Sequence, residues 1–369
     1  MWKLNFKTRN CILHKNGVRL YSHGQKHYLR CFYFCERKLA IWAPYIFVTL
    51  ILQGHGKDML KVDLITGFLG SGKTTFLREY AKYLMKCGLN IGILEYDHGA
   101  VNVDVLLLKD LRGKNCEIEN VSAGCDTDCL RRRFKTKLIA MAMTGYDRVI
   151  IEPSGIFDMD EFFDCMRDEP LDRLCCIGNV ITIVNAEPEE NMGKAASALL
   201  AAQAVSAGKI VLSRTELVSA EDIQKTKEFV KKAAKDIGCE CELDDRFFVK
   251  NRDELTDDDY HMLSECGYRI SDYVKYFRSE ESFSSVCVLK SPCGIRLLEK
   301  KTAEMFNDPS YGNILRIKGF AFEDGKCYEQ NATREKTESK IIKEGQNVVI
   351  VIGTGLDRDR ITSFIMKIQ

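Results

Sequence analysis

VDLITGFLGSGKTTFL, residues 62–77, is the stretch of sequence that decides the fold of this chain. A short apolar run leads into the spacing Gly-x-x-x-x-Gly-Lys-Thr from Gly67 to Thr74, and a helical pattern follows at once. This spacing, between a strand and a helix, is typical of a phosphate-binding P-loop. The glycines let successive backbone N–H groups point at phosphate oxygens, and the positive end of the following helix adds to that field. The stretch therefore predicts that the chain binds a nucleoside triphosphate.

Each loop position has an expected role. Lys73 is expected to reach the β- and γ-phosphates, and the hydroxyl of Thr74 is expected to ligate Mg²⁺. The remaining nucleotide-binding positions of the loop are Gly67, Gly70, Ser71, Gly72 and Thr75.

Composition and charge limit the alternatives. The chain has 369 residues, of which 45% are hydrophobic and 29% charged, and its formal net charge is +1. This length suffices for two domains, and the near-neutral charge gives no indication of a nucleic-acid partner. Residues 1–58, however, hold ten Lys and Arg against two acidic residues, whereas the rest of the chain holds 44 basic and 51 acidic residues. We expect 1–58 to be a basic extension, added or mis-assigned, and the functional protein to start at Met59.

Residues 39–52 form an apolar run that resembles a membrane or targeting segment. Its fourteen residues fall short of the roughly 20 that a membrane helix needs, and Pro44 interrupts it. A signal peptide fits only in outline, because the basic region in front of the run is too long. Since nucleotide and Mg²⁺ are cytoplasmic supplies, we expect a cytoplasmic protein without a membrane partner. The sixteen scattered cysteines then favour reduced thiols or metal ligands over disulfides.

From Met59 onward, strand and helix patterns alternate. Apolar, β-rich runs lie at 62–66, 90–95, 148–152, 180–184, 209–213 and 247–249, and amphipathic stretches lie at 74–86, 130–144, 195–207 and 219–237. Repeated βα units of this kind predict an α/β fold, a P-loop NTPase domain over 59–250 with a mainly parallel sheet covered by helices. Residues 251–282 are charged and irregular, which indicates a linker or a short helical connection. Strand patterns at 285–290, 313–321, 326–332 and 347–352, with helices at 294–306 and 357–367, predict a small α+β C-terminal domain over 283–369.

Two further segments can complete a P-loop site. In DRVIIEPSG, residues 147–155, apolar positions lead to a carboxylate at a strand end, so Glu152 is expected to hold the Mg²⁺ shell, directly or through water, or the attacking water. Gly155 can offer its N–H to the γ-phosphate. After the strand at 90–95, Asp97 is expected to sense the γ-phosphate and to act in catalysis. The alternatives are an ordinary strand end at Glu152 and a surface carboxylate at Asp97.

KIVLSRTEL, residues 209–217, stands where a base-recognition strand is expected. It is similar to Asn-Lys-x-Asp, with each specified position replaced by a related residue. Glu216 keeps the carboxylate that accepts from guanine, Arg214 can stack on the base, and Ser213 lacks the amide. The segment predicts a preference for guanine.

A cysteine-containing loop precedes the helical pattern at 130–144. Cys125 and Cys129 flank acidic residues there, and thiolates with carboxylates can bind a divalent ion such as Zn²⁺. Two structural cysteines are the alternative, because Cys-x-x-x-Cys is a weaker pattern than Cys-x-x-Cys.

Taken together, these segments resemble the CobW-like GTPases, relatives of the nickel-insertion GTPases of urease and hydrogenase maturation. The resemblance covers residues 59–369 and includes the P-loop, Glu95-x-Asp97-x-Gly99, Glu152-x-Ser-Gly155 and the C-terminal runs at 313–319 and 353–359. It implies a GTP-driven metallochaperone that holds its metal at a Cys-x-Cys-Cys loop and passes it to a client metalloprotein. This chain departs from that loop, since Thr127 and Asp128 stand where two of the cysteines are expected.

The sequence therefore predicts a GTPase of slow turnover that couples GTP and Mg²⁺ to metal delivery, with Lys73, Asp97 and Glu152 as the catalytic residues. Two alternatives stay open. One is a nucleotide-sensing activator of a metalloprotein or corrinoid protein, without metal transfer. The other is a P-loop kinase for small molecules. A homodimer is compatible with each of these three functions.

Overall fold

A computed structural model describes residues 3–6, 9–14, 17–22, 25–29, 59–96, 108–121, 127–187, 192–275, 283–334, 336–342, 345 and 347–367. The chain divides into two compact units, Met1–Asp58 and Met59–Gln369. In the first unit, four strands that the sequence did not predict form an antiparallel sheet in chain order. They are β1 (Lys3–Phe6), β2 (Arg9–His14), β3 (Gly17–Ser22) and β4 (Gln25–Leu29).

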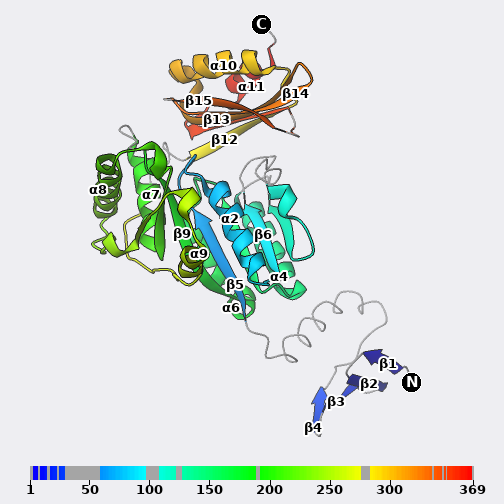
Figure 1. Ribbon diagram of the computed structural model, residues 1–369. Helices are drawn as coiled ribbons and strands as arrows, with labels where there is room; N and C mark the ends of the chain where they lie inside the picture. Colours follow the sequence, from blue (N-terminus) through cyan, green and yellow to red (C-terminus); the bar gives the residue numbers. More distant parts are fainter. Residues whose placement is uncertain are drawn as a thin grey trace. The chain divides into compact units, whose positions relative to one another are not determined.

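The larger unit contains a seven-stranded, wholly parallel sheet in the order β11-β10-β9-β5-β8-β6-β7 (Figure 1). Its strands are β5 (Leu60–Thr66), β6 (Ile91–Tyr96), β7 (Cys116–Val121), β8 (Arg148–Pro153), β9 (Cys175–Asn185), β10 (Lys209–Ser213) and β11 (Phe247–Val249). The α-helices that accompany it are α2 (Lys73–Lys86), α4 (Thr127–Thr144), α5 (Met159–Arg167), α6 (Leu171–Leu174), α7 (Lys194–Ser206), α8 (Ala220–Asp236) and α9 (Asp257–Ser264). The predicted α/β class is confirmed, and β5, which carries the P-loop, is the middle strand.

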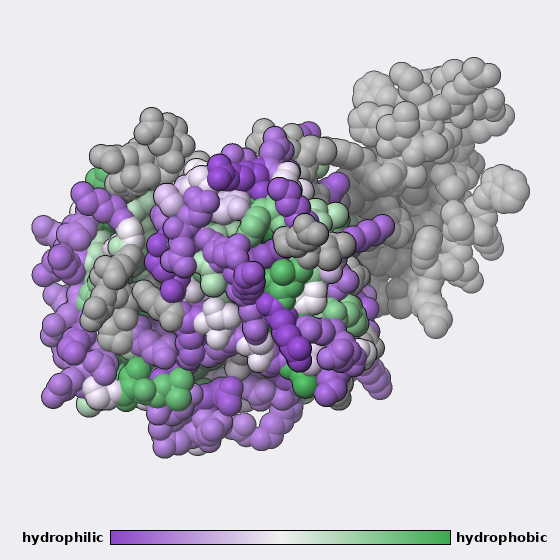
Figure 2. Space-filling view, turned by 90° about the horizontal axis from the view of Figure 1, so that it is seen from above, coloured by the Kyte–Doolittle hydropathy of each residue, from purple (hydrophilic) through white to green (hydrophobic). Residues whose placement is uncertain are grey.

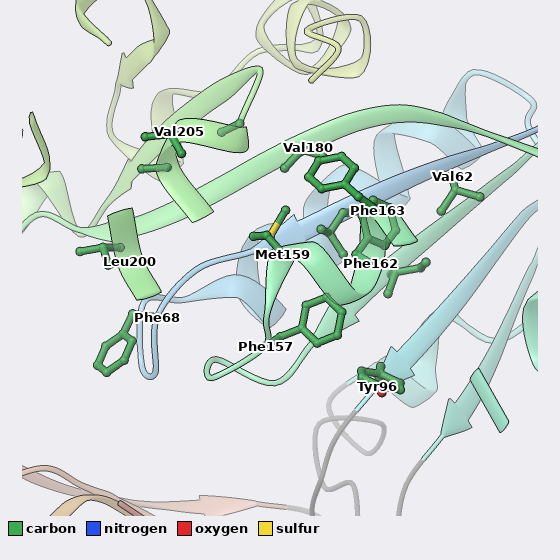
Figure 3. Close-up of a cluster of buried hydrophobic side chains, with 14 of the residues drawn as sticks. Val62, Phe68, Tyr96, Phe157, Met159, Phe162, Phe163, Val180, Leu200 and Val205 are labelled. Atoms are coloured by element: carbon green, nitrogen blue, oxygen red, sulfur yellow. The ribbon is translucent and has the colours of Figure 1, made fainter. Parts of the chain in front are cut away.

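Alternate side chains of each central strand enter two different cores. Val149 and Ile151 of β8 pack in the core formed with α4, α5, α7 and α8, whereas Ile150 packs in the core formed with α2 and α9. Figure 3 shows part of the first core, where Phe162 and Phe163 of α5 lie against the sheet. Because both faces are buried, the central strands are mainly apolar, which is the pattern that the sequence displayed.

Four elements of this layer were not predicted as such: β7, α9, and the helices α5 and α6, which lie in none of the predicted amphipathic stretches. β7 is an edge strand in which Glu117 is exposed, so it lacks a continuous apolar run. α9 lies inside the segment predicted as a linker or short helical connection. A capping box between Thr256 and Asp259 starts this helix, and Tyr260 and Leu263 pack in the same core as α2.

The C-terminal part forms a separate antiparallel sheet in the order β12-β16-β13-β14-β15. Its elements are β12 (Phe283–Leu289), α10 (Ile295–Asn307), β13 (Asn313–Glu323), β14 (Lys326–Ala332), β15 (Thr337–Ile342), β16 (Val348–Thr354) and α11 (Arg358–Met366). Both helices pack on one face, over Ile314, Ile317 and Val351. β15 was not predicted, because nearly all of its side chains are exposed and polar.

Surface hydropathy gives little further organisation. In the view of Figure 2, hydrophobic residues appear as small patches among hydrophilic ones. Within the described ranges, we find no helix with the length and apolar character needed to cross a membrane.

A buried polar network lies at the amino-terminal end of β8. Arg148 Nη1 lies 3.1 Å from Asp63 Oδ2, and the hydroxyl of Tyr80 donates to the same oxygen at 2.8 Å. Asn179 Nδ2 donates to Asp63 Oδ1 at 2.9 Å, and Arg148 also donates to the carbonyl of Ser264 at 3.0 Å. Burial raises the pKa of Asp63, and Arg148 opposes that effect. The network joins three strands to α2 and α9.

We predict that Arg148→Met lowers the free energy of unfolding by about 3–5 kcal/mol, because it leaves Asp63 charged and buried without its ionic partner. Urea unfolding of the full chain, followed by circular dichroism, measures this loss. The matched control is Arg78→Met, whose partner Asp110 has a side chain 57% exposed; that pair is expected to contribute less than about 1 kcal/mol. Equal losses in the two variants would contradict the prediction.

Candidate functional site

The P-loop connects β5 to α2 and depends on its glycines. Gly67, Gly70 and Gly72 have φ values of 145°, 79° and 94°, a region that favours glycine. At Gly67 a Cβ would also lie 2.1 Å from the carbonyl oxygen of Ile183 on β9. Phe68 and Leu69 anchor the loop in the core, and Figure 3 shows Phe68 at the tip of the loop beside Leu200.

Within the loop, the lysine donates to backbone oxygens that a phosphate can replace. Lys73 Nζ donates to the carbonyls of Gly67 and Phe68 at 3.0 and 3.3 Å. The hydroxyl oxygen of Ser71 is buried and has no hydrogen-bond partner among the described residues. A ring of amides with a lysine and a buried hydroxyl fits a polyphosphate.

The side-chain oxygens of Thr74 and Glu152 lie close enough to bind one Mg²⁺ ion together. β5 and β8 are neighbours, so the helix after β5 begins beside the end of β8. Thr74 Oγ1 donates to Glu152 Oε1 at 2.7 Å. Hydroxyl and carboxylate oxygens are the ligands that Mg²⁺ takes alongside phosphate. The donor set therefore fits Mg²⁺ bound to a triphosphate.

Two further residues complete this region. Gly155 lies against the P-loop, since a Cβ there would be 2.7 Å from the backbone nitrogen of Leu69. Glu95 of β6 lies opposite Glu152 in the register of β6 with β8. Both residues line a cavity of about 230 Å³ that also contains Lys73 and Thr74. The sequence indicated Glu95 only as part of the segment Glu95-x-Asp97-x-Gly99 in the family resemblance and gave it no site role of its own.

The predicted base-recognition residues lie next to the P-loop. Ser213 Oγ donates to the backbone carbonyl of Ser71 at 2.6 Å. Arg214 does not extend as a base-stacking group: its guanidinium donates to the carbonyl of Gly70 at 3.2 Å and to Glu187 at 3.1 Å. Burial acts to raise the pKa of Glu187, but hydrogen bonds from Asn185 and Arg214 outweigh it and the pKa is lowered.

A cavity of about 140 Å³ lies between β10, the start of α2 and the segment that follows β11. Its lining includes Gly72, Thr75 and Glu216, which the sequence predicted to bind nucleotide. It also includes Lys250 and Arg252, which were missed. Their position just after β11 could have indicated that they line this site, because parallel strands end at one edge of the sheet.

The predicted transition-metal site is only partly described. Asp97 and Cys125 lie outside the described residues, while Cys129 lies in the first turn of α4. Among the residues that the structure covers, no group of three or more His, Cys, Asp or Glu side chains could hold a metal ion. Tyr96, at the end of β6, is buried against Phe134 of α4. The metal site therefore stays a prediction.

We predict that Gly155→Ala weakens GTP binding by about tenfold or more, because the added methyl displaces the P-loop backbone at Leu69. Titration with a fluorescent GTP analogue measures the change. Gly193→Ala is the matched control, since a Cβ there meets nothing within 4 Å. Unchanged affinity in Gly155→Ala would show that the loop does not need this close approach.

Sequence comparisons agree with this site. Residues 61–238 match the family model described as CobW/HypB/UreG, nucleotide-binding domain. The zinc chaperone YjiA of Escherichia coli is 28% identical over 169 residues, which are 43% of this chain and 50% of that protein. The zinc-regulated GTPase metalloprotein activator 1 of Schizosaccharomyces pombe is 25% identical over 181 residues, 47% of this chain and 44% of that protein. The chain thus spans about half the length of the curated relatives it matches.

Among solved structures, Zn(II)-bound YjiA GTPase from E. coli covers 84% of this chain and 98% of its own, with 17% identity and a TM-score of 0.37. HypB from Helicobacter pylori in complex with nickel covers 60% of this chain and 89% of its own, with 15% identity and a TM-score of 0.34. Similarity at this level supports no further conclusion. The match of residues 61–238 to the CobW/HypB/UreG nucleotide-binding domain confirms the predicted resemblance to the CobW-like P-loop GTPases.

Proposed function

We propose that this protein hydrolyses GTP and couples hydrolysis to delivery of a divalent transition metal to a client protein. The main observation in support of GTP binding and hydrolysis is the hydrogen bond from Thr74 to Glu152 beside the P-loop lysine. The metal half is supported by the names of two relatives, a zinc chaperone and a zinc-regulated GTPase metalloprotein activator.

In the proposed reaction the protein contributes positioning and charge. Lys73 would exchange its two carbonyl partners for phosphate oxygens, and Thr74 with Glu152 would hold the Mg²⁺ that neutralises charge developing on the phosphates. Glu152 and Asp97 would orient the attacking water, and the N–H of Gly155 would bond the γ-phosphate. In-line attack on phosphorus requires little more of the protein than this placement.

Guanine selection is proposed to depend on the cavity beside β10. Glu216 lines it and would accept hydrogen bonds from guanine N1 and N2. Adenine has no donors at these positions, so the carboxylate would be left without partners and ATP would bind more weakly.

For the metal, we propose Zn²⁺ as the first candidate cargo and Cys125 and Cys129 as its thiolate ligands, with Asp97 or Asp128 adding an oxygen. Cys129 lies in the first turn of the helix that packs against Tyr96 at the end of β6, which supports a link between this loop and the nucleotide site. Nucleotide turnover would then change the loop and release the ion to the client.

One experiment separates this proposal from the alternatives: phosphate release from GTP and from ATP, with and without Zn²⁺, Co²⁺ or Ni²⁺. The proposal expects slow GTP hydrolysis that a bound metal changes. Equal use of ATP would overturn the GTPase proposal. Transfer of phosphate to an added small molecule would indicate a kinase, and nucleotide binding without hydrolysis would indicate a sensing module.

We predict that Lys73→Ala abolishes turnover, because no other P-loop side chain can bridge the β- and γ-phosphates.

Glu216→Ala is expected to lower the preference for GTP over ATP by about 10- to 150-fold, the value of hydrogen bonds to a charged group. Relative kcat/KM values for the two nucleotides measure this. Glu221→Ala, in the exposed first turn of α8, should leave the preference unchanged.

We also predict that the double variant Cys125→Ser/Cys129→Ser loses bound Zn²⁺ but keeps nucleotide affinity, since a hydroxyl is a poor zinc ligand. Equilibrium dialysis with metal analysis is the measurement. Cys87→Ser, in an exposed position after α2, is the control. Zinc retention in the double variant would contradict the assignment of these ligands.

A further inference from the structure

The C-terminal sheet has a charged face that its helices do not cover. α10 and α11 pack on one face, and the opposite face carries Arg316 and Lys318 on β13, the middle strand of the five. Lys318 is 8% exposed, so its charge lies in a largely buried position. Burying charged groups is unfavourable unless nearby groups compensate them. Glu329 supplies part of that compensation for Lys318.

A bulge in β13 aims Arg316 at this face. In the pairing with β16, Ile314 lies opposite Gly353 and Arg316 opposite Ile352, so Leu315 is an extra residue. Regular alternation would place Ile314 and Arg316 on the same face. With the bulge, Ile314 enters the helix-side core while Arg316 points to the other side of the sheet. Bulges near functional sites commonly redirect a side chain in this way.

The same bulge joins the two sheets. Leu315 packs against the core of the parallel sheet, as do Ile352 and Phe283. The charged face is thereby held next to the loops at the carboxyl end of the parallel strands. Figure 1 shows the C-terminal sheet beyond that end, with β12 nearest to it.

One cavity has the P-loop and this face as its two walls. The cavity of about 230 Å³ that contains Lys73, Thr74 and Glu152 is also lined by Arg316, Lys318 and Lys340. Arg316 lines a neighbouring cavity of about 570 Å³ as well, which reaches Gly70 of the P-loop.

The sheet side of the cavity carries three cationic side chains, Arg316, Lys318 and Lys340, together with the carboxylates of Glu329 and Glu338. Lys318 and Lys340 share Glu329, at 3.7 and 2.9 Å from its two oxygens. The Nε of Arg316 donates to the neutral amide oxygen of Asn331 at 2.8 Å. Such a wall favours an anion in the cavity, and a polyphosphate held by the P-loop is that anion.

We propose that the C-terminal sheet is the second wall of the nucleotide site and that Arg316 contacts the terminal phosphate of a bound nucleoside triphosphate. This inference depends on the proposed nucleotide binding. A planar guanidinium donates two parallel hydrogen bonds to phosphate oxygens, which lysine cannot match. A diphosphate lacks that contact, so Arg316 makes the position of the C-terminal sheet depend on which nucleotide is bound.

The test measures the affinities of the full chain for a non-hydrolysable GTP analogue and for GDP. Arg316→Ala is expected to weaken binding of the analogue by about 10- to 150-fold and to change GDP affinity less than about twofold. Arg316→Lys should recover part of the loss. Arg316→Gln removes the charge with less loss of side-chain volume. It replaces Arg316→Ala in the affinity measurements if the alanine variant does not fold. The control is Arg296→Ala on α10, whose side chain is 84% exposed.

The outcomes separate this inference from the proposed function. If wild type binds the analogue and the Arg316 variants bind it as tightly as Arg296→Ala, Arg316 has no such role, while the proposed function stands. Equal weakening for the analogue and for GDP would overturn the assignment to the terminal phosphate. If wild type binds neither nucleotide, the proposed function itself fails.

Discussion

The parallel direction of all strands in the larger sheet is the constraint on which the candidate site depends. Every strand ends at the same edge, so segments far apart in sequence must meet there. The P-loop follows β5, Glu152 ends β8, and Ser213 ends β10, with Thr74 bonded to Glu152 and Ser213 to Ser71 as a result. Parallel sheets of this kind place ligands at the carboxyl ends of their strands for the same reason.

The two ends of the sheet have different physical tasks. At the amino-terminal end of β8, Asp63 and Arg148 form a buried ion pair that Tyr80 and Asn179 complete, so the polar groups there satisfy one another. At the carboxyl end, the P-loop lysine is held by backbone carbonyls that a ligand can replace, and the hydroxyl of Ser71 has no partner among the described residues. Saturated hydrogen bonds at one end favour stability, and replaceable ones at the other favour binding.

The C-terminal sheet follows different rules from the parallel one. It is antiparallel, with helices on one face only, so its other face is available to contribute to a site. The charge on that face and the bulge that orients Arg316 are local features, yet their meaning depends on the neighbouring P-loop. In the inference drawn above, this face and the P-loop are the two walls of one nucleotide site.

From the sequence alone, a mainly parallel sheet and the P-loop could be predicted, and Thr74 and Glu152 could each be assigned to Mg²⁺, because continuous apolar runs and fixed spacings indicate these features. The sequence did not predict β7 or β15, whose polar exposed residues carry little apolar signal and which exist because a neighbouring strand pairs with them. Nor did it predict that Arg214 bonds to the P-loop, that Lys250 and Arg252 line the cavity beside β10, or that Arg316 shares a cavity with Lys73. Asp97 and Cys125 lie outside the described residues and stay predictions. The contacts of Arg214, Lys250, Arg252 and Arg316 required the tertiary structure, because they join residues that no sequence spacing relates.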